Sequence, residues 1–437
     1  MSVPRGELEA LFRAALAAVE PGRAVRRAIR RDGTRLEVAG DALPEDAGCV
    51  VLAIGKAAAP MAAAFADEAG ERVRRGLIVT RDGAAASPVP QHVLREAGHP
   101  LPDARSAAAG AEALALAAAA ESSETLVVLL SGGASALTSC PAPGVGLDAL
   151  RETTELLLRA GAEIAELNCV RKHLTRIAGG RLAAATRARA TLVLAISDVR
   201  GDDWATLGSG PCAADPTRYA DALAVLSRRS LLARVPEAVR RHLEEGAAGR
   251  QPESVKPGDP ALARVRNALV ASNRDALVAA REAGRAQGLA TRIVTEGLSG
   301  EACVAGRRVA ALAQAVRPGP PQLLLFGGET TVTVRGGGRG GRAQELALAA
   351  AIALAGDERV ALLAAGTDGS DGPTPAAGAY ADGGTLARGA AAGLDAGAAL
   401  AENDAYGFFA REGGAFVTGP TGTNVMDLVL VRVAGGT

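Results

Sequence analysis

The sequence predicts an α/β protein of two domains, and three observations lead to this prediction. At 437 residues the chain is too long for one hydrophobic core. Unbroken apolar runs of strand length alternate with Ala-rich helical stretches, as in parallel sheets covered by helices. Gly, Pro and charged residues dominate positions 245–266, which is typical of a linker. We therefore expect a Rossmann-like three-layer α/β domain over residues 1–250 and a second α/β domain over 251–437, with the active site in a cleft between them.

The composition favours a protein that acts on small molecules. Lys and Arg together number 48, as do Asp and Glu, and aromatic residues make up only 2%. The chain thus lacks the basic field and the stacking side chains expected of a nucleic-acid-binding protein. Its five cysteines form no CxxC pair, no signal peptide is evident, and no apolar run is long enough to span a bilayer. We expect a cytoplasmic monomer or homodimer with buried thiols and no membrane contact.

The first domain is predicted from four short apolar runs. Each has the length of a buried strand and is followed by glycine-rich or polar residues. An amphipathic helix over residues 1–20 precedes them, and Asp103 is a start signal for a later helix. The predicted strands span 49–54, 76–80, 126–130 and 191–196, and the helices span 57–70, 103–120 and 147–187.

The first of these strands runs into Gly55-Lys56 and then into a helix of small residues. A positive charge at a helix N-terminus opposes the helix dipole, so Lys56 is poorly placed for stability. This favours a functional role, although a surface lysine at a helix start is the alternative. The turn is not a Walker A loop, because GxxxxGK[ST] is missing.

The strand at 126–130 ends in Ser131-Gly132-Gly133, with Ser135 two residues further on. Successive N–H groups in such a loop can form a nest for an anion. A serine nucleophile needs a nearby base, and no GxSxG elbow is present. We therefore expect this loop to bind a phosphate or substrate.

Charged residues follow in the same half of the chain. Arg171 lies in the helical region and either reaches an acidic ligand or is solvated. Asp198 comes directly after the strand at 191–196, a usual position for a ligand of Mg²⁺ or substrate. His173 is expected to be a polar helix residue rather than a metal ligand, and His99 to be a surface loop residue.

The second half repeats the alternation of strands and helices. Its predicted strands span 268–272, 292–296, 323–326, 360–365 and 428–433, and its helices span 273–288, 300–316 and 343–354. A further β-rich run at 330–334 is expected to follow Glu329.

A loop with five glycines and three arginines, residues 335–342, leads into the helix at 343–354. Glycine lets a backbone approach a ligand closely, arginine offers a planar fork for phosphate, and a helix N-terminus favours an anion. Together they predict a phosphate site that includes Gly337, Gly338 and Arg342. A flexible, solvated hairpin is the alternative.

Carboxylates follow two strands of the second half. Asp368 and Asp371 lie among glycines after the strand at 360–365, and Glu329 follows the strand at 323–326. The first two resemble the start of a calcium loop, but the spacing of an EF-hand is absent. We expect these acids to hold Mg²⁺ or the substrate, with Asp198 and Asp371 as candidate metal ligands; a tight Asx turn is the alternative. Cations, glycine nests and carboxylates are the groups that phosphoryl transfer needs.

Eight stretches in order along the chain resemble the two-domain bacterial glycerate 2-kinases, whose C-terminal part is a MOFRL domain (the DUF4147/MOFRL family). They are AIGKAA (53–58), SGGASAL (131–137), LNCVRKHLTRIAGGRLA (167–183), ISDVRGDD (196–203), GSGP (208–211), FGGETTVTVRGGGRGGRAQE (326–345), GTDGSDGPT (366–374) and TGPTGTNVMDL (418–428). The resemblance implies that ATP phosphorylates D-glycerate at its 2-hydroxyl with Mg²⁺ present. It also implies that Lys56 and Arg342 are catalytic.

Two positions depart from the pattern of this family. Ala343 stands where an Asn is usual, and Cys212 where a Thr is common. These departures put side-chain hydrogen bonds in doubt, but not those of the backbone. The alternatives are an NAD(P)H-dependent hydroxypyruvate reductase and a non-catalytic anion-binding module. The reductase would need a GxGxxG motif after the first strand, and none is present.

Overall fold

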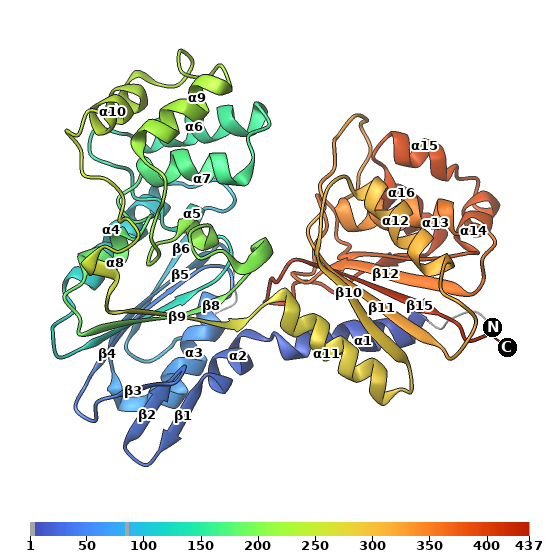
Figure 1. The fold of residues 1–437 in the computed structure, drawn as a ribbon, viewed down its shortest axis with the longest axis horizontal. Coiled ribbons are helices and arrows are strands. Elements are labelled where there is room, and N and C mark those ends of the chain that lie inside the picture. Colours follow the sequence, from blue (N-terminus) through green and yellow to red (C-terminus); the bar gives the residue numbers. More distant parts are fainter. Residues whose placement is uncertain (1–4, 84–86, 437) are drawn as a thin grey trace. The chain divides into compact units, whose positions relative to one another are not determined.

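The computed structural model describes residues 5–83 and 87–436, which form two compact units (Figure 1). One unit holds residues 21–270. The other holds the residues up to 20 together with those from 271 onwards. This division differs from the boundary expected between residues 250 and 251.

The first unit is organised around a six-stranded sheet of β4 (Cys49–Ile54), β5 (Val73–Arg81), β6 (His92–Ala97), β7 (Thr125–Leu130), β8 (Ala190–Ile196) and β9 (Val265–Ala271). The strand order is β6-β5-β4-β7-β8-β9, and every pair from β6 to β8 is parallel. After β4 the chain moves outwards to β6 and then returns to place β7 on the other side of β4. Open α/β sheets bind ligands at the carboxyl ends of the strands where the order reverses, which here lies between β4 and β7.

Helices cover both faces of this sheet, with α3 (Ala58–Ala69) on one face and α4 (Ala104–Ala118) on the other (Figure 1). Strands covered on both faces are continuous apolar runs, and every residue of β4 and β7 is buried. Asp103 caps α4, as predicted, by accepting a hydrogen bond from the N–H of Ser106 at 2.9 Å. A small meander of β1 (Ile29–Asp32), β2 (Arg35–Val38) and β3 (Asp41–Leu43) and the helix α2 (Pro21–Arg27) complete this side of the unit.

The helical region expected at 147–187 is broken into α6 (Leu147–Arg159), α7 (Ile164–His173) and α8 (Arg181–Ala185). Together with α9 (Tyr219–Arg228) and α10 (Glu237–Ala247), the helices α6 and α7 form a cluster with a hydrophobic core of its own (Figure 1). Leu157, Leu226 and Leu243 are fully buried in this core. The short helix α5 (Ala134–Leu137) connects β7 to this region.

The segment 245–266, expected to be a linker, packs as part of the first unit. The N–H of Val255 donates to Gly179 O at 2.9 Å, and the N–H of Asp215 donates to Val255 O at 2.8 Å. The strand expected at 268–272 is β9, and it lies beside β8 at the edge of the first sheet. The expectation that it opens the second α/β series was therefore wrong.

The second unit has a mixed sheet of β10 (Ala290–Leu298), β11 (Gln322–Gly328), β12 (Val360–Gly366), β13 (Gly378–Asp382), β14 (Ala415–Phe416) and β15 (Asp427–Val433). Its order is β10-β11-β15-β12-β13-β14. Only β10 and β11 pair in parallel, and β15 lies antiparallel between β11 and β12. The ends of β11 and β12 are thus brought beside the start of β15.

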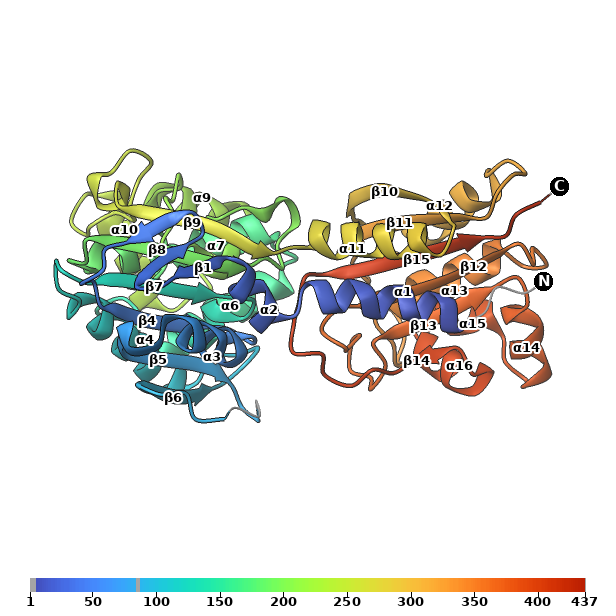
Figure 2. The same cartoon turned by 90° about the horizontal axis from the view of Figure 1, so that it is seen from below.

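Helices also cover both faces of the second sheet. One face carries α1 (Arg5–Ala18) and α11 (Asn273–Ala286), and the other carries α12 (Ala302–Gln314) and α13 (Arg342–Ala353) (Figures 1 and 2). The helices α14 (Thr385–Ala391), α15 (Ala396–Ala401) and α16 (Ala405–Glu412) follow β13. The core is built largely from Ala, Leu and Val, as the composition predicts.

The N-terminal helix α1 belongs to this second unit although the rest of the unit begins at residue 271. Phe12 packs edge-on against Phe416, with 5.4 Å between the ring centroids. Arg432 Nε donates to Glu7 Oε1 at 2.8 Å, and Thr423 Oγ1 donates to Val19 O at 2.8 Å. The amphipathic pattern predicted the helix, but the surface that it covers lies far away in the sequence.

The β-rich run at 330–334 is not a strand of the sheet, which corrects the sequence-based expectation. Thr331 forms only an isolated bridge with Glu301, and the chain then continues as a loop to α13. The hairpin expected there is therefore absent from the described structure.

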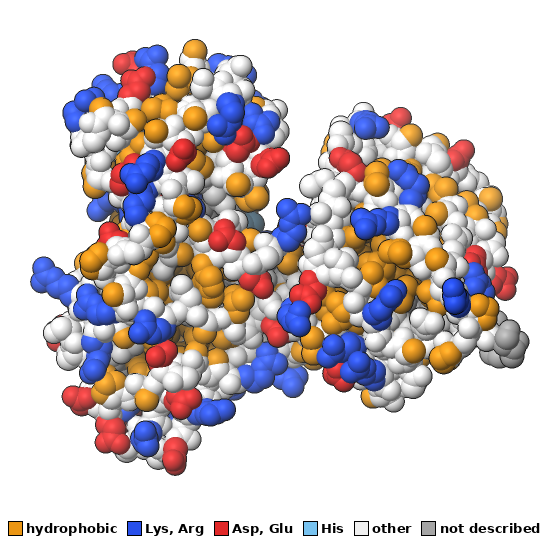
Figure 3. All heavy atoms as spheres, viewed as in Figure 1, with side chains coloured by type: hydrophobic (Ala, Val, Ile, Leu, Met, Phe, Trp, Pro, Cys, Tyr) orange, Lys and Arg blue, Asp and Glu red, His pale blue; other side chains and the backbone are white. Residues whose placement is uncertain are grey.

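Basic and acidic side chains are interspersed over the face shown in Figure 3. No field of a single sign dominates this face of either unit. Within residues 5–83 and 87–436, no helix combines the length and the apolar character needed to cross a membrane.

Candidate active site

Two loops of the first unit are joined at the point where the strand order reverses. The N–H of Lys56, after β4, donates to Gly132 O at 2.9 Å, and the N–H of Ala57 donates to Ser131 Oγ at 3.1 Å. Gly55 has a φ of 129°, and a side chain there would collide with the backbone of Ser131. These contacts fix Lys56 and the Ser131 loop side by side, after the carboxyl ends of β4 and β7.

The loop Ser131–Gly133 has the form of an anion nest. The N–H groups of Gly132 and Gly133 donate to no described residue. Gly133 has a φ of 89° and precedes α5. Ser131 is only 2% exposed, and its hydroxyl oxygen already accepts the hydrogen bond of Ala57. Ser131 therefore shapes the loop, and the two glycines offer their N–H groups to a ligand.

Asp198 lies directly against this nest. A Cβ placed on Gly132 would overlap the carboxylate of Asp198, which follows β8. A carboxylate beside a cradle for anions is an arrangement in which a cation can bridge the two. The position after a buried strand, predicted from sequence, thus brings Asp198 to the same loop as Lys56.

His99 is a neighbour that the sequence did not identify. A Cβ on Gly133 would lie 3.0 Å from His99 Cδ2 and 3.4 Å from Lys56 Cγ. Burial, together with the charges of Lys56 and Arg81, lowers the pKa of His99 to about 4. The imidazole is therefore neutral at pH 7. No signal in the sequence marked this position, because the run that forms β6 was not predicted as a strand and His99 was expected in a surface loop.

A second group of polar side chains lies beside these loops, in a narrow pocket. Arg171 from α7, Ser135 from α5 and Ser209 line it together with Ile54, the last residue of β4. Ser135 Oγ and Ser209 Oγ are 2.7 Å apart. Cys212, which departs from the family pattern, is 4% exposed, and burial raises the pKa of its thiol to about 12. It therefore acts as a small apolar core residue.

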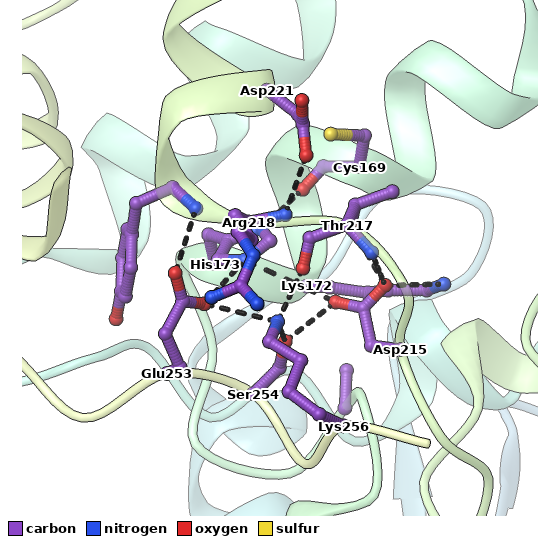
Figure 4. A network of polar contacts seen from close by, with 12 residues as sticks. Cys169, Lys172, His173, Asp215, Thr217, Arg218, Asp221, Glu253, Ser254 and Lys256 are labelled. Atoms are coloured by element: carbon purple, nitrogen blue, oxygen red, sulfur yellow. Dashed lines mark hydrogen bonds and ion pairs between the residues drawn. The ribbon is translucent and has the colours of Figure 1, made fainter.

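The residues next to Arg171 belong to a buried polar network (Figure 4). Lys172 Nζ lies 3.4 Å from Asp215 Oδ1, and His173 Nε2 lies 3.3 Å from Glu253 Oε2. His173 is fully buried, and burial lowers its pKa. It is a structural residue of α7. Lys172 is likewise held within the fold.

In the second unit, Arg342 is the first residue of α13 and is held by two acids. Its Nε and Nη2 donate to the two carboxylate oxygens of Asp427 at 2.6 and 3.0 Å, and its Nη1 lies 2.5 Å from Glu329 Oε1. Burial alone would lower the pKa of Arg342, but Asp427 and Glu329 raise it above its usual value. The guanidinium is thus permanently charged and fixed in direction.

Asp371 occupies the N-terminus of the helix α13. It accepts hydrogen bonds from the N–H groups of Ala343 at 3.1 Å and Gln344 at 2.8 Å, and from Gln344 Nε2 at 2.9 Å. Its carboxylate therefore fills the helix-end site that the sequence predicted for a phosphate. Ala343 contributes only its N–H, so the asparagine usual in the family is not needed for this cap. The metal role of Asp371 stays a prediction.

The glycine-rich loop packs against its own chain. The N–H of Gly336 donates to Asn403 Oδ1 at 3.1 Å, and the N–H of Gly338 donates to Glu402 O at 2.9 Å. Side chains at these two glycines would strike residues 402–404. Gly337 has open space around it. Gly336 and Gly338 therefore let the loop pack closely against the segment between α15 and α16, and not against a ligand. Of these three glycines, Gly337 alone has the open space expected of a ligand contact.

Asp368 lies close to Asp427 at the ends of β12 and β15. A Cβ on Gly366 would be 3.4 Å from Oδ1 of each. Asp368 Oδ1 accepts two hydrogen bonds from Ser370, both at 3.0 Å, which is the Asx turn considered as the alternative. Asp368 thus forms an Asx turn and also lies near Asp427. The second unit therefore gathers four charged side chains at one edge of its sheet: Arg342, Glu329, Asp368 and Asp427.

The sequence matches two known families over these regions. Residues 7–244 match a domain of unknown function, DUF4147, and residues 322–427 match the MOFRL family. The chain is 40% identical over 426 residues to the glycerate 2-kinase of Pyrococcus horikoshii, which covers 96% of this chain and 95% of that protein. The chain belongs to the glycerate 2-kinase family. A second relative, the D-glycerate 2-kinase of Thermotoga maritima, is 39% identical over 386 residues, which are 87% of this chain and 89% of that protein.

Solved structures in the glycerate 2-kinase family confirm the fold. The crystal structure of the glycerate kinase of Thermotoga maritima matches 97% of this chain and 98% of its own, with a TM-score of 0.85 and 37% identity. A crystal structure of a protein from Pyrococcus horikoshii matches the whole of both chains, with a TM-score of 0.83 and 38% identity.

Asp427, like His99, belongs to the candidate site and was not identified from the sequence. It lies in the stretch at 418–428 that carried the resemblance, directly before the predicted strand at 428–433. The sequence did hold a signal, because an acid next to a buried strand is costly unless a positive charge pairs with it, and this predicts a basic partner for Asp427. Within residues 5–83 and 87–436, no three His, Cys, Asp or Glu side chains form a cluster suited to a metal ion.

Proposed function

We propose that the protein is a glycerate 2-kinase that uses ATP to phosphorylate D-glycerate at its 2-hydroxyl, giving 2-phospho-D-glycerate and ADP. Membership of the family supports this reaction. The observation that carries it is the position of Lys56 beside the N–H groups of Gly132 and Gly133, which no described residue accepts, where the strand order reverses. A lysine next to an anion nest is a site for a phosphoryl group.

The proposed chemistry is an in-line displacement. The 2-hydroxyl oxygen forms a bond to the γ-phosphorus of ATP, the bond from that phosphorus to the β,γ-bridging oxygen breaks, and ADP leaves with its electron pair. The hydroxyl proton passes to a carboxylate of the site other than the one that holds Mg²⁺. Negative charge develops on the phosphoryl oxygens, and Lys56 and Arg342 neutralise it.

A divalent cation fits the oxygen ligands at this loop. Asp198 lies against a nest that favours phosphate, and Mg²⁺ binds in proteins through one or two carboxylates together with phosphate oxygens. In the proposal Asp198 holds this Mg²⁺, which supplies charge neutralisation of the nucleotide phosphates. Glu329 and Asp368 then serve mainly to position Arg342 and the substrate.

The proposal assigns both Lys56 and Arg342 to one reaction. Removing two groups that act on the same transition state is less than additive. The variant with both Lys56→Ala and Arg342→Ala should therefore lose less activity than the product of the two single losses. Fully multiplicative losses would show that the two residues act independently of each other.

The direct test measures ADP formation from ATP and Mg²⁺, with and without D-glycerate, and reads the position of the product's phosphate by ³¹P NMR. ADP formation that depends on glycerate, with the phosphate at C2, is the expected result. No turnover by folded protein would reject the proposal.

One relative gives a reason to test a reductase as well. A protein of Agrobacterium vitis, 39% identical over 392 residues, bears the provisional name hydroxypyruvate reductase. The first βα turn of this chain lacks the GxGxxG that binds a dinucleotide. Oxidation of NADH or NADPH by hydroxypyruvate, measured at 340 nm in the same preparation, should be absent.

A further inference from the structure

Arg171 is a charged side chain that no described residue neutralises. Its guanidinium forms no ion pair or hydrogen bond with the residues that the structure describes. Burial lowers the pKa of Arg171 below its usual value, and no carboxylate acts to raise it. Arg171 is half-buried, and a charge that is partly withdrawn from water without a partner is costly for folding. Arg171 is therefore better explained by an anion that binds to it than by a contribution to stability.

The backbone around Arg171 is held in place by its neighbours. Lys172 and His173 are buried at the end of α7 and contact Asp215 and Glu253 (Figure 4). His242 Nε2 lies 3.0 Å from the carbonyl oxygen of His173 and ties α10 to the same point. The following side chains thus anchor the helix end, while Arg171 alone lines the pocket. A preorganised arginine loses little freedom when a ligand binds.

The hydroxyl groups of Ser135 and Ser209 line the pocket together with Arg171, and their hydrogen bonds run in a defined direction. Ser209 Oγ donates to Asn168 Oδ1 at 3.2 Å, so its only proton is used. Ser135 Oγ, 2.7 Å from Ser209 Oγ, must therefore donate to it. This leaves Ser135 with lone pairs and no proton, so it can accept a hydrogen bond from a ligand but cannot donate one. A hydroxyl group suits this position, whereas a second carboxylate oxygen does not.

The backbone at Ser209 gives a second, independent observation. Gly208, Ser209 and Gly210 have φ values of 58°, 61° and 63°. Glycine adopts this left-handed conformation without strain, but a serine there costs about 1–3 kcal/mol. Strain of this kind is concentrated at functional sites. The side chain of Ser209 is retained between two glycines in the pocket that Arg171 lines.

We propose that this pocket is the subsite for the non-reacting groups of a small hydroxy acid. Arg171 binds the carboxylate through its planar fork, and Ser135 accepts a hydrogen bond from a hydroxyl that is not phosphorylated. The inference rests on the proposed function for the identity of the acid, D-glycerate, whose 3-hydroxyl would contact Ser135. Ile54, which lines the pocket, lies two residues before Lys56. In the proposal the 2-hydroxyl of the bound acid therefore faces the Lys56 loop.

Direct binding tests this subsite without any catalytic step. The ligands are D-glycerate, 3-hydroxypropanoate, D-lactate and propane-1,2-diol, measured by saturation-transfer NMR with Mg²⁺ and a non-transferable ATP analogue. The wild type should bind the two acids with a 3-hydroxyl, bind D-lactate more weakly, and bind the diol not at all. Arg171→Gln should weaken binding of all three acids by about 10- to 100-fold.

Matched variants separate this role from a structural one. Arg176→Gln removes an exposed arginine five residues along that does not line the pocket, and it should leave binding unchanged. Arg171→Lys keeps the positive charge but loses the planar fork, so it should bind the three acids with an intermediate affinity. It replaces Arg171→Gln in the test if that variant does not fold. Ser135→Ala should remove the preference for D-glycerate over D-lactate while leaving D-lactate binding unchanged.

The outcomes are distinct from those that test the kinase. Equal binding of D-glycerate to the wild type and Arg171→Gln would overturn the subsite, as would a wild type that binds none of the acids. Binding that depends on Arg171, in a protein that forms no ADP with glycerate, would instead reject the proposed function and leave the subsite standing.

Discussion

Asp427 holds Arg342 through two parallel hydrogen bonds of 2.6 and 3.0 Å. A bidentate pair fixes the plane of a guanidinium as well as its position. Glu329 lies 2.5 Å from the remaining terminal nitrogen, so three directions of the fork are restrained. Arg342 opens α13 and Asp427 opens β15, and the antiparallel placement of β15 beside β11 brings them together.

Asp427→Asn should reduce activity without unfolding the second unit. The amide keeps the shape of the side chain but loses the charge and one of the two acceptor oxygens, so Arg342 is aimed less well. Because a small misplacement of a catalytic group is costly, kcat should fall by about 10- to 100-fold. Glu329→Gln removes a single, more exposed contact and should cost less. Steady-state kinetics with thermal melting decide this, and a kcat of Asp427→Asn equal to that of the wild type contradicts it.

Lys56→Ala should lower kcat by about 100- to 1,000-fold with little change in the thermal midpoint. In the proposal the ammonium group of Lys56 stabilises the negative charge of the transferring phosphoryl group. Loss of one stabilising group of this kind has an effect of this size. The backbone N–H of Lys56, which binds Gly132 O, is kept by the alanine variant. Lys56→Arg is the matched control for charge, and it should recover part of the rate. A near-normal kcat for Lys56→Ala would remove the residue from the mechanism.

Four of the six strands of the first sheet could be predicted because they carry local signals, whereas β6 was expected as a loop and β9 as part of the second domain. Strands buried on both faces are continuous apolar runs, so β4, β7 and β8 are visible in the sequence. Parallel strands place their carboxyl ends at one edge, and this rule alone brings Lys56, the Ser131 loop and Asp198 together. No comparable rule reveals a loop side chain such as His99.

The second unit was harder to predict because its organisation depends on distant segments. Nothing local to residues 5–18 shows that this helix packs beside α11. The glycines at 336 and 338 could not be distinguished from a ligand cradle, because the segment 402–404 that fills the space is more than sixty residues away. Asp371 likewise resembled a metal ligand in sequence, whereas its hydrogen bonds to Ala343 and Gln344 make it a helix cap.

The cap at Asp371 should give the protein a pH-dependent stability. Burial raises the pKa of this carboxyl to about 6, from an ordinary value near 4. The folded protein thus holds the proton more tightly than the unfolded chain, so the stabilising effect of protonation is complete below pH 4 and is lost as the pH rises through 6. A shift of this size corresponds to about 3 kcal/mol.

Asp371→Asn provides the measurement, since the amide cannot ionise. The difference in thermal midpoint between this variant and the wild type should change in favour of the variant as the pH rises from 4 to 7. Asp357→Asn is a control, because the pKa of this carboxyl is lowered by Arg359 and its effect has the opposite sign. A constant difference for Asp371→Asn over this range would mean that the carboxyl is ionised throughout.

Alanine substitutions at the neighbouring residues Gly337 and Gly338 should have different effects on stability. Gly338 has no room for a side chain, because a Cβ there would strike Glu402 and Asp404, while Gly337 has nothing within 4 Å. Neither has a positive φ, so backbone strain does not enter. Gly338→Ala should therefore destabilise the second unit by about 1–3 kcal/mol, and Gly337→Ala should leave its thermal midpoint unchanged. If Gly337 contacts a phosphate, Gly337→Ala will raise the KM for ATP while stability stays constant. Equal stability losses in both variants would show that the packing against residues 402–404 does not set the conformation of the loop.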